Sequence, residues 1–186
     1  MAYDDTPPKG KVGLIRGHPA LAAAGRTRPR HRMLELPETE MCGDLVQAGV
    51  KLAPQHVTAL LGLKPGDRAF VRQRLLTHDG EPVELVAAWL PLELAAGTDL
   101  ASPELLNESI RQHLLTHKKI RLDHAFEQIT ARHPRGEETT LLRVPPDTPV
   151  LSVIITAYDA ASQPVQVSDL VLPGHRHELR DAYPFI

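Results

Sequence analysis

The sequence predicts an α+β domain in which an antiparallel sheet carries helices packed on one of its faces. About 42% of the 186 residues are apolar, which is enough for a substantial core. Most of the strand patterns follow one another as hairpins, which is the connectivity of an antiparallel sheet. Three helical patterns are inserted between roughly seven strands, so a doubly wound parallel sheet is not expected.

The first half of the folded part predicts a strand, a short helix and a hairpin. Residues 45–52 alternate loosely between apolar and polar and predict a strand. Residues 54–62 predict a helix, with proline in its first turn and glycine at its end. Residues 69–76 and 82–90 predict two strands of a β-hairpin, because the Asp79-Gly80 pair between them favours a tight turn.

The second half predicts a longer helix followed by alternating short elements. Ser102 is expected as the N-cap of this helix and Pro103 as its first residue, and the helix should end near Lys118. The elements expected after it are a strand at 126–131, a short helix that follows residues 135–138 and ends at Leu142, strands at 149–158 and 164–172, and a last strand at about 177–183.

Composition excludes several classes of protein. The 21 Lys and Arg against 23 Asp and Glu give a net charge of −2, which argues against nucleic-acid binding by bulk charge. The one cysteine, Cys42, rules out a disulfide framework and a cysteine-based zinc site. No apolar run is long enough for a membrane span and no signal peptide follows Met1, so we expect a cytoplasmic protein without a membrane partner.

The chain is expected to divide into a loose basic N-terminal segment, residues 1–42, and a ligand-binding domain, residues 43–186. Five arginines stand between residues 11 and 32. They permit a nucleic-acid arm, but a solvated connecting segment is favoured, because prolines and glycines interrupt the stretch and no aromatic residue lies between the arginines.

Two arginines are the clearest candidates for a binding site. Arg72 and Arg74 alternate along one expected strand, so both guanidinium groups point to the same side. Such a pair suits a phosphate or a carboxylate, although two exposed arginines on a polar face are the plainer interpretation of the spacing. Trp89, the only tryptophan, is either a platform for a planar ligand or, more simply, a core aromatic.

Metal binding and nucleophilic catalysis are not expected. His113 and His117 have the i, i+4 spacing of a chelating pair, but no glutamate follows His113 in the zincin pattern and the leucines between them belong to a core stripe. No Gly-x-Ser-x-Gly elbow is present, so no catalytic residue is assigned. We therefore expect neither a metal nor another cofactor.

Eight short motifs, in this order, resemble the UTRA domain, the effector-binding half of HutC-type GntR transcription regulators. The resemblance covers about residues 43–186. The motifs are Leu60-Leu61-Gly62-Leu63-Lys64-Pro65-Gly66-Asp67, Val71-Arg72-Gln73-Arg74-Leu75, Asp79-Gly80-Glu81-Pro82-Val83, Trp89-Leu90-Pro91, Ala131-Arg132 with Glu137-Glu138, Thr148-Pro149-Val150-Leu151, Tyr158-Asp159 and Gln163-Pro164-Val165. The resemblance implies a chorismate-lyase-like fold, with an antiparallel sheet curled around a small-molecule pocket, and pairing of these domains as a homodimer.

The resemblance also implies roles for individual residues. The Arg-x-Arg motif lines the effector pocket in the family, which favours Arg72 and Arg74 as ligand-binding residues here. Ser109 matches a position at the start of the inserted helix where the family holds an anion, although a solvent-facing serine within the helix is an equal alternative. Asp169, with Ser168 before it, follows a family pattern and could accept a ligand hydroxyl, although a capped turn or an exposed edge is the plainer interpretation.

Three departures from the family pattern point to the type of ligand. Val86 and Gln166 replace carboxylates that sugar-phosphate-binding members carry, and His175 replaces an aspartate, while Arg176 is retained. A pocket with arginine donors, an amide and an apolar wall suits a small acid with an apolar or aromatic body better than an amino-sugar phosphate.

The function expected from this resemblance is a sensor of a small anionic metabolite. Family members bind DNA through a winged helix ahead of this domain, and residues 1–42 are too short to hold one. The chain is then a stand-alone UTRA protein or a piece of a longer regulator, with little DNA binding of its own. The alternatives are a chorismate-lyase-like enzyme that acts on a small carboxylic acid, and an interaction module that assembles a regulator through its sheet edge.

Overall fold

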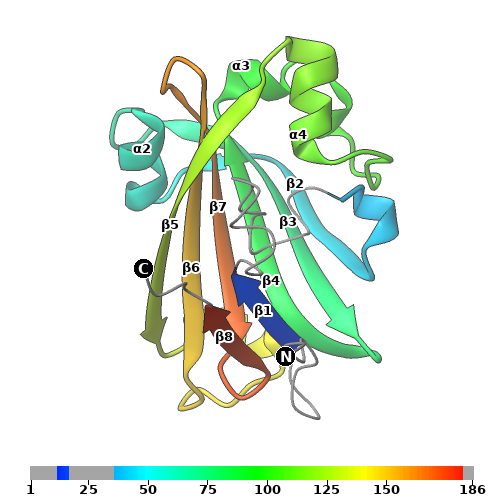
Figure 1. The fold of residues 1–186 in the computed structure, drawn as a ribbon, viewed down its shortest axis with the longest axis vertical. Helices are drawn as coiled ribbons and strands as arrows, with labels where there is room; N and C mark the ends of the chain where they lie inside the picture. Colours follow the sequence, from blue (N-terminus) through cyan, green and yellow to red (C-terminus); the bar gives the residue numbers. More distant parts are fainter. Residues whose placement is uncertain (1–11, 17–35, 182–186) are drawn as a thin grey trace, which may run out of the picture.

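The structure, a computed structural model, describes residues 12–16 and 36–181 (Figure 1). These residues contain eight strands, five short α-helical or 3-10 segments, and a helical stretch that changes from α to π geometry. They are β1 (Val12–Arg16), η2 (Glu38–Glu40), β2 (Gly43–Leu52), α2 (Gln55–Leu61), β3 (Arg68–His78), β4 (Glu81–Leu90), α3 (Leu92–Ala95), η3 (Asp99–Ala101), α4 (Ile110–His113), η4 (Leu114–Lys118), β5 (Leu122–Arg132), α5 (Glu138–Leu142), β6 (Val150–Asp159), β7 (Pro164–Pro173) and β8 (His177–Asp181).

Six of the strands form one antiparallel sheet in the order β2-β3-β4-β7-β6-β5, which confirms the predicted fold class. The remaining two, β1 and β8, pair in parallel as a separate two-stranded sheet, which the sequence analysis did not anticipate. Figure 1 shows β1 and β8 side by side at one end of the molecule, in front of the large sheet.

The central hairpin forms as predicted and sets the register of the site. Asp79 and Gly80 both have positive φ, 52° and 77°, as a two-residue turn of this type requires. The register then places Arg72 opposite Ala88, and Arg74 opposite Val86. Directly opposed residues of an antiparallel pair share a face, so all four lie on one side of the sheet.

Helices α2 and α5 cover the other side of the sheet. Val71, Trp89 and Val167 are opposed across β3, β4 and β7, and they pack with Val57 and Leu61 of α2 in one core cluster. A second cluster joins Leu142 of α5 to the same face. These two helices lie on one face, as the sequence analysis expected, although other helical segments pack on the opposite face.

Residues 92–118 pack against the face that carries the arginines. Phe70 and Leu90 form a core cluster with Leu100, Leu106 and Leu114, which come from η3, the loop after it and η4. Figure 1 shows α3 and α4 gathered at one end of the sheet. Helical segments thus lie on both sides of the sheet, and those on this side close one end of the site.

The inserted helix begins later than its sequence pattern predicts. Ser109, rather than Ser102, is the N-cap, and its side chain accepts a hydrogen bond from the Gln112 amide. The carbonyls of Leu100, Ser102 and Glu104 instead accept hydrogen bonds from the Arg72 guanidinium. Arg72 holds the carbonyl of every second residue from 100 to 104, an arrangement that a helix does not allow. The segment 102–108 therefore stays outside the helix, although Ser102 and Pro103 favour a helix start.

Candidate functional site

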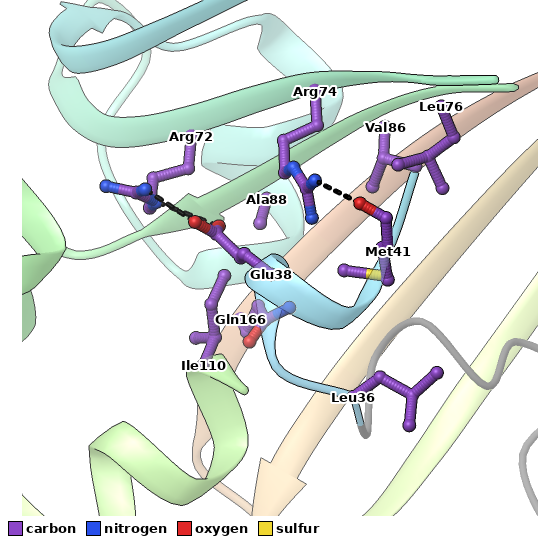
Figure 2. Close-up of a pocket in the computed structure, with 10 residues that line it drawn as sticks. All are labelled: Leu36, Glu38, Met41, Arg72, Arg74, Leu76, Val86, Ala88, Ile110 and Gln166. Carbon is purple, nitrogen blue, oxygen red and sulfur yellow. Dashed lines mark hydrogen bonds and ion pairs between the residues drawn. The ribbon is translucent and has the colours of Figure 1, made fainter. Parts of the chain in front are cut away.

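A small pocket opens on the face of the sheet that carries the arginines, and Figure 2 shows its walls. Strands β3, β4 and β7 form its floor, the start of α4 closes one side, and residues 36–41 lie across it. Its volume is about 40 Å³, which holds about three water molecules. The lining residues are Leu36, Glu38, Met41, Arg72, Arg74, Leu76, Val86, Ala88, Ile110 and Gln166.

Arg72 is buried in this wall and uses every one of its five N–H donors. Its Nε and Nη2 bind the two carboxylate oxygens of Glu38 at 3.0 and 2.6 Å. The other three N–H groups donate to the carbonyls of Leu100, Ser102 and Glu104, at 2.7–2.8 Å. An arginine has no further donor, so Arg72 in this arrangement is fully paired within the protein.

Glu38 is a pocket residue that the sequence analysis missed. It lies in the segment that we assigned to the loose N-terminal part, yet its side chain is only 5% exposed. Besides Arg72, its Oε2 accepts a hydrogen bond from the Leu106 amide at 2.9 Å. The signal in the sequence is slight: an isolated Pro37-Glu38 pair in a stretch without apolar periodicity.

Arg74 differs from Arg72 because most of its donors are unpaired. Its Nη2 donates to the Met41 carbonyl at 3.3 Å, whereas Nε and Nη1 are buried without a hydrogen-bond partner among the described residues. Burial lowers the pKa of this guanidinium, and the nearby Glu38 carboxylate opposes that shift. A buried cation with unused donors that faces a pocket is a candidate position for binding an anion.

The rest of the wall is apolar apart from one amide. Val86 and Ala88 lie beside the two arginines on the same face of the sheet, and Figure 2 shows Ile110 close to Gln166. The Gln166 side chain donates to Oγ of Ser168, its neighbour on the same face of β7, at 2.8 Å. The structure thus brings together Arg72, Arg74, Val86 and Gln166 as the sequence analysis expected, with Ser168 as their neighbour.

The structure places the other expected site residues elsewhere. Ser109 caps α4, whose first residue, Ile110, lines the pocket. Trp89 and Asp169 lie on the opposite face of the sheet: Trp89 packs under α2, and Asp169 accepts hydrogen bonds from His56 of α2 at 2.8 and 2.9 Å. This bond raises the pKa of His56. Arg176 contacts the exposed Glu81 at 3.4 Å, away from the pocket lining.

Glu84 is a second buried carboxyl on the arginine face of β4. It is 5% exposed, and its Oε1 has no hydrogen-bond partner among the residues that the structure describes. Burial raises the pKa of Glu84 to about 8, so the carboxyl is largely protonated at neutral pH. It does not line the pocket, and it contributes a pH dependence to stability rather than a charge to the site.

The two histidines with chelating spacing are joined by a carboxylate. Glu108 Oε1 lies 2.8 Å from His113 Nδ1 and 3.4 Å from His117 Nε2. An ionised carboxylate only accepts, so His113 carries its proton on Nδ1 and leaves Nε2, which is buried and has no partner among the described residues, as an acceptor. A metal on Nδ1 would move the proton to Nε2 and bury an unpaired donor. The geometry therefore fits a hydrogen-bonded side-chain cluster better than a metal site.

Two other expectations concern nucleic acid and membrane. The nucleic-acid arm considered for residues 11–32 lies outside the described residues except for β1, of which only the backbone is described. Among the residues that the structure describes, no helix has the length and apolar character needed to cross a membrane.

Comparison with known proteins bears on the family. The family model described as the UTRA domain matches residues 40–178. The C-terminal domain of Yurk from Bacillus subtilis has a similar structure, with a TM-score of 0.67 and 18% identity over 75% of this chain and 95% of that one.

Two further solved structures are similar. The effector domain of PhnF from Mycobacterium smegmatis has a TM-score of 0.65 and 21% identity over 77% of this chain and 87% of that one. The C-terminal domain of the histidine utilization repressor from Pseudomonas syringae has a TM-score of 0.62 and 18% identity over 77% and 99%. A search of curated proteins found no significant match.

Proposed function

Because the chain belongs to the UTRA domain family, whose members are the ligand-sensing domains of GntR regulators, we propose that it senses a small acid with one negative charge and an apolar body. The acid group lies at Arg74, and the body lies against the aliphatic side chains around it. Gln166 supplies one polar contact that orients the ligand.

The observation that carries this proposal is the state of Arg74. Its unpaired nitrogens are buried, and a buried donor without an acceptor costs about 1–3 kcal/mol. A carboxylate that enters the pocket removes this cost and adds a charge-assisted hydrogen bond of about 1.5–3 kcal/mol. A polyhydroxylated ligand gains less, since Val86, Ala88 and Ile110 offer its hydroxyl groups no partner.

Calorimetry with benzoate and glucosamine 6-phosphate as probes tests the proposal. We expect benzoate to bind more tightly than the sugar phosphate, and Arg74→Gln to weaken benzoate by about ten- to hundredfold, as the loss of a charge-assisted hydrogen bond predicts. Arg176→Gln removes the same charge outside the pocket and serves as the matched control. Benzoate binding that Arg74→Gln leaves unchanged, or tighter binding of the sugar phosphate, contradicts the proposal.

The pocket favours sensing over catalysis. Glu38 is the carboxylate that lines it, and both of its oxygens are held by Arg72 and the Leu106 amide. A general acid or base needs a lone pair or proton directed at the substrate. Among the described lining residues, none offers that role, which leaves the chorismate-lyase-like enzyme without a specific supporting contact.

The wider setting of the domain follows from the same family. We propose that the protein acts in the cytoplasm as a homodimer and reaches DNA through a winged-helix domain of the regulator. Apolar side chains on both edge strands of the large sheet support the pairing: Phe126 on β5 is 61% exposed, and Leu52 on β2 is 67% exposed.

A further inference from the structure

We propose that Glu38 determines which ligand charge the pocket accepts: it acts as a built-in anion that occupies Arg72 and leaves one unpaired cation for the ligand. This inference rests on the proposed function of the pocket as an anion sensor. It assigns to Glu38 a selectivity for ligands with one negative charge over ligands with two.

The contact has the geometry of a bound carboxylate. Both Glu38 oxygens lie against the same edge of the Arg72 guanidinium, which is the paired arrangement that arginine forms with carboxylate ligands. The side chains are 5% and 1% exposed, so water screens their attraction very little. Figure 2 shows the carboxylate between the two arginines, on the side from which a ligand anion would approach Arg72.

The charges that line the pocket do not cancel. Arg72 and Arg74 bring two positive charges and Glu38 brings one negative charge, while the seven other lining residues are neutral. Among the residues that the structure describes, one positive charge remains, and it belongs to Arg74, whose Nε and Nη1 are unpaired. A monoanion neutralises this remainder. A dianion would leave one negative charge uncompensated in a buried site, which is strongly unfavourable.

The alternative is that Glu38 only ties residues 36–41 to the rest of the domain. Its hydrogen bond from the Leu106 amide and the Thr39 amide's bond to the Leu106 carbonyl are consistent with such a tie. The two roles predict different results. A tie affects the stability of the fold and lowers the affinity for every ligand, whereas a built-in anion also changes the ratio of affinities between dianions and monoanions.

The test compares sulfate, a dianion at all pH values near neutral, with benzoate, a monoanion, by calorimetry on the full chain. Glu38→Gln keeps the size of the side chain and removes its charge, so the pocket then holds two cations. We expect the affinity for sulfate, relative to that for benzoate, to rise at least tenfold. Glu40→Gln is the matched control, because Glu40 lies in the same turn, is exposed and carries the same charge. It should leave the ratio unchanged.

Equal ratios in wild type, Glu38→Gln and Glu40→Gln overturn the inference, as does an equal rise in both variants. The proposed function fails separately, if Arg74→Gln does not weaken benzoate binding to the wild-type domain. If Glu38→Gln is partly unfolded, unfolding is followed with and without sulfate. Leu100→Ala, a variant of the buried core, is the control for general destabilisation. If sulfate restores the fold of Glu38→Gln but not that of Leu100→Ala, the result supports Glu38 as a built-in anion. If sulfate restores both variants equally, or neither, the result contradicts it.

Discussion

Arg72 and Arg74 share one face of β3, yet their side chains contribute oppositely to stability. Arg72→Met leaves the Glu38 carboxylate buried without its cation and frees three backbone carbonyls, so we expect a loss of about 3–5 kcal/mol. Arg74→Met removes one long hydrogen bond to the Met41 carbonyl, together with two buried nitrogens that have no partner among the described residues, so it should be neutral or stabilising by about 1 kcal/mol. Urea unfolding monitored by circular dichroism measures both changes.

The control for this pair of variants is Arg176→Met. Arg176 and Glu81 form a partly exposed ion pair at 3.4 Å, and such pairs contribute less than about 1 kcal/mol. A loss at Arg72 no larger than the loss at Arg176 would mean that the Glu38 contact is weak, and it would remove the basis for calling Arg72 a structural residue.

Glu84 gives the folded state a pH dependence that is unusual for a carboxyl. Its pKa is raised to about 8 in the folded state, so between the unfolded value near 4.5 and about 8 the folded protein binds more protons than the unfolded chain. Stability is therefore highest below the unfolded pKa and falls as the pH rises through this range, by several kcal/mol in all. Above about 8 the contribution stays lost.

Unfolding of wild type and Glu84→Gln between pH 5 and pH 9 checks this expectation. His56, whose pKa is also raised, loses its contribution in the same direction as the pH rises, so the difference between the two proteins isolates Glu84. We expect that difference to shift in favour of the glutamine variant as the pH rises to about 8, and to level off above it. A difference that is constant across the range contradicts the raised pKa.

At the residue scale, the sequence predicts the arginine pair but not its partner. The two-residue period of β3 is a local property, and it places Arg72 and Arg74 together. Glu38 lies 34 positions before Arg72, and no local pattern joins them. The same period argues against Trp89 as a ligand-binding residue. Trp89 lies three positions from Val86 on β4, so the two side chains are on opposite faces of the sheet.

At the scale of elements, the capping of α4 is the sharpest test of where this helix begins. Ser109→Ala removes an N-cap that accepts from the Gln112 amide, and we expect a loss of about 0.5–2 kcal/mol. Ser102→Ala removes only an exposed turn contact to the Glu104 amide and should cost less. Thermal unfolding of the two variants shows which serine caps the helix. A larger loss of stability in Ser102→Ala than in Ser109→Ala would favour a helix that begins at Ser102.

The elements that local signals determine agree with the sequence analysis, and those that distant contacts determine do not. The β3–β4 hairpin depends on Asp79-Gly80, and the end of α2 on Gly62, which has a φ of 69°. Both signals lie within the element itself. The start of α4 and the strand β1 depend instead on Arg72 and on β8, which are far away along the chain.

At the scale of the whole molecule, the proposed homodimer predicts a measurable species. Sedimentation at micromolar concentration should show twice the monomer mass. Phe126→Asp on β5 and Leu52→Asp on β2 place a charge on the two edges of the sheet, and we expect only one of them, at the paired edge, to give monomers. A monomeric wild type contradicts pairing, and dimers that survive both substitutions exclude the sheet edges as the interface.

The parallel pairing of β1 with β8 has a consequence for the order in which the chain assembles. Val12 is aligned with His177, so 165 positions separate the partners of this small sheet. During synthesis β1 leaves the ribosome first, while β8 emerges after the hairpins between them can already have closed. The small sheet of β1 and β8 therefore forms last. A chain that stops before His177 leaves β1 without the strand with which it pairs.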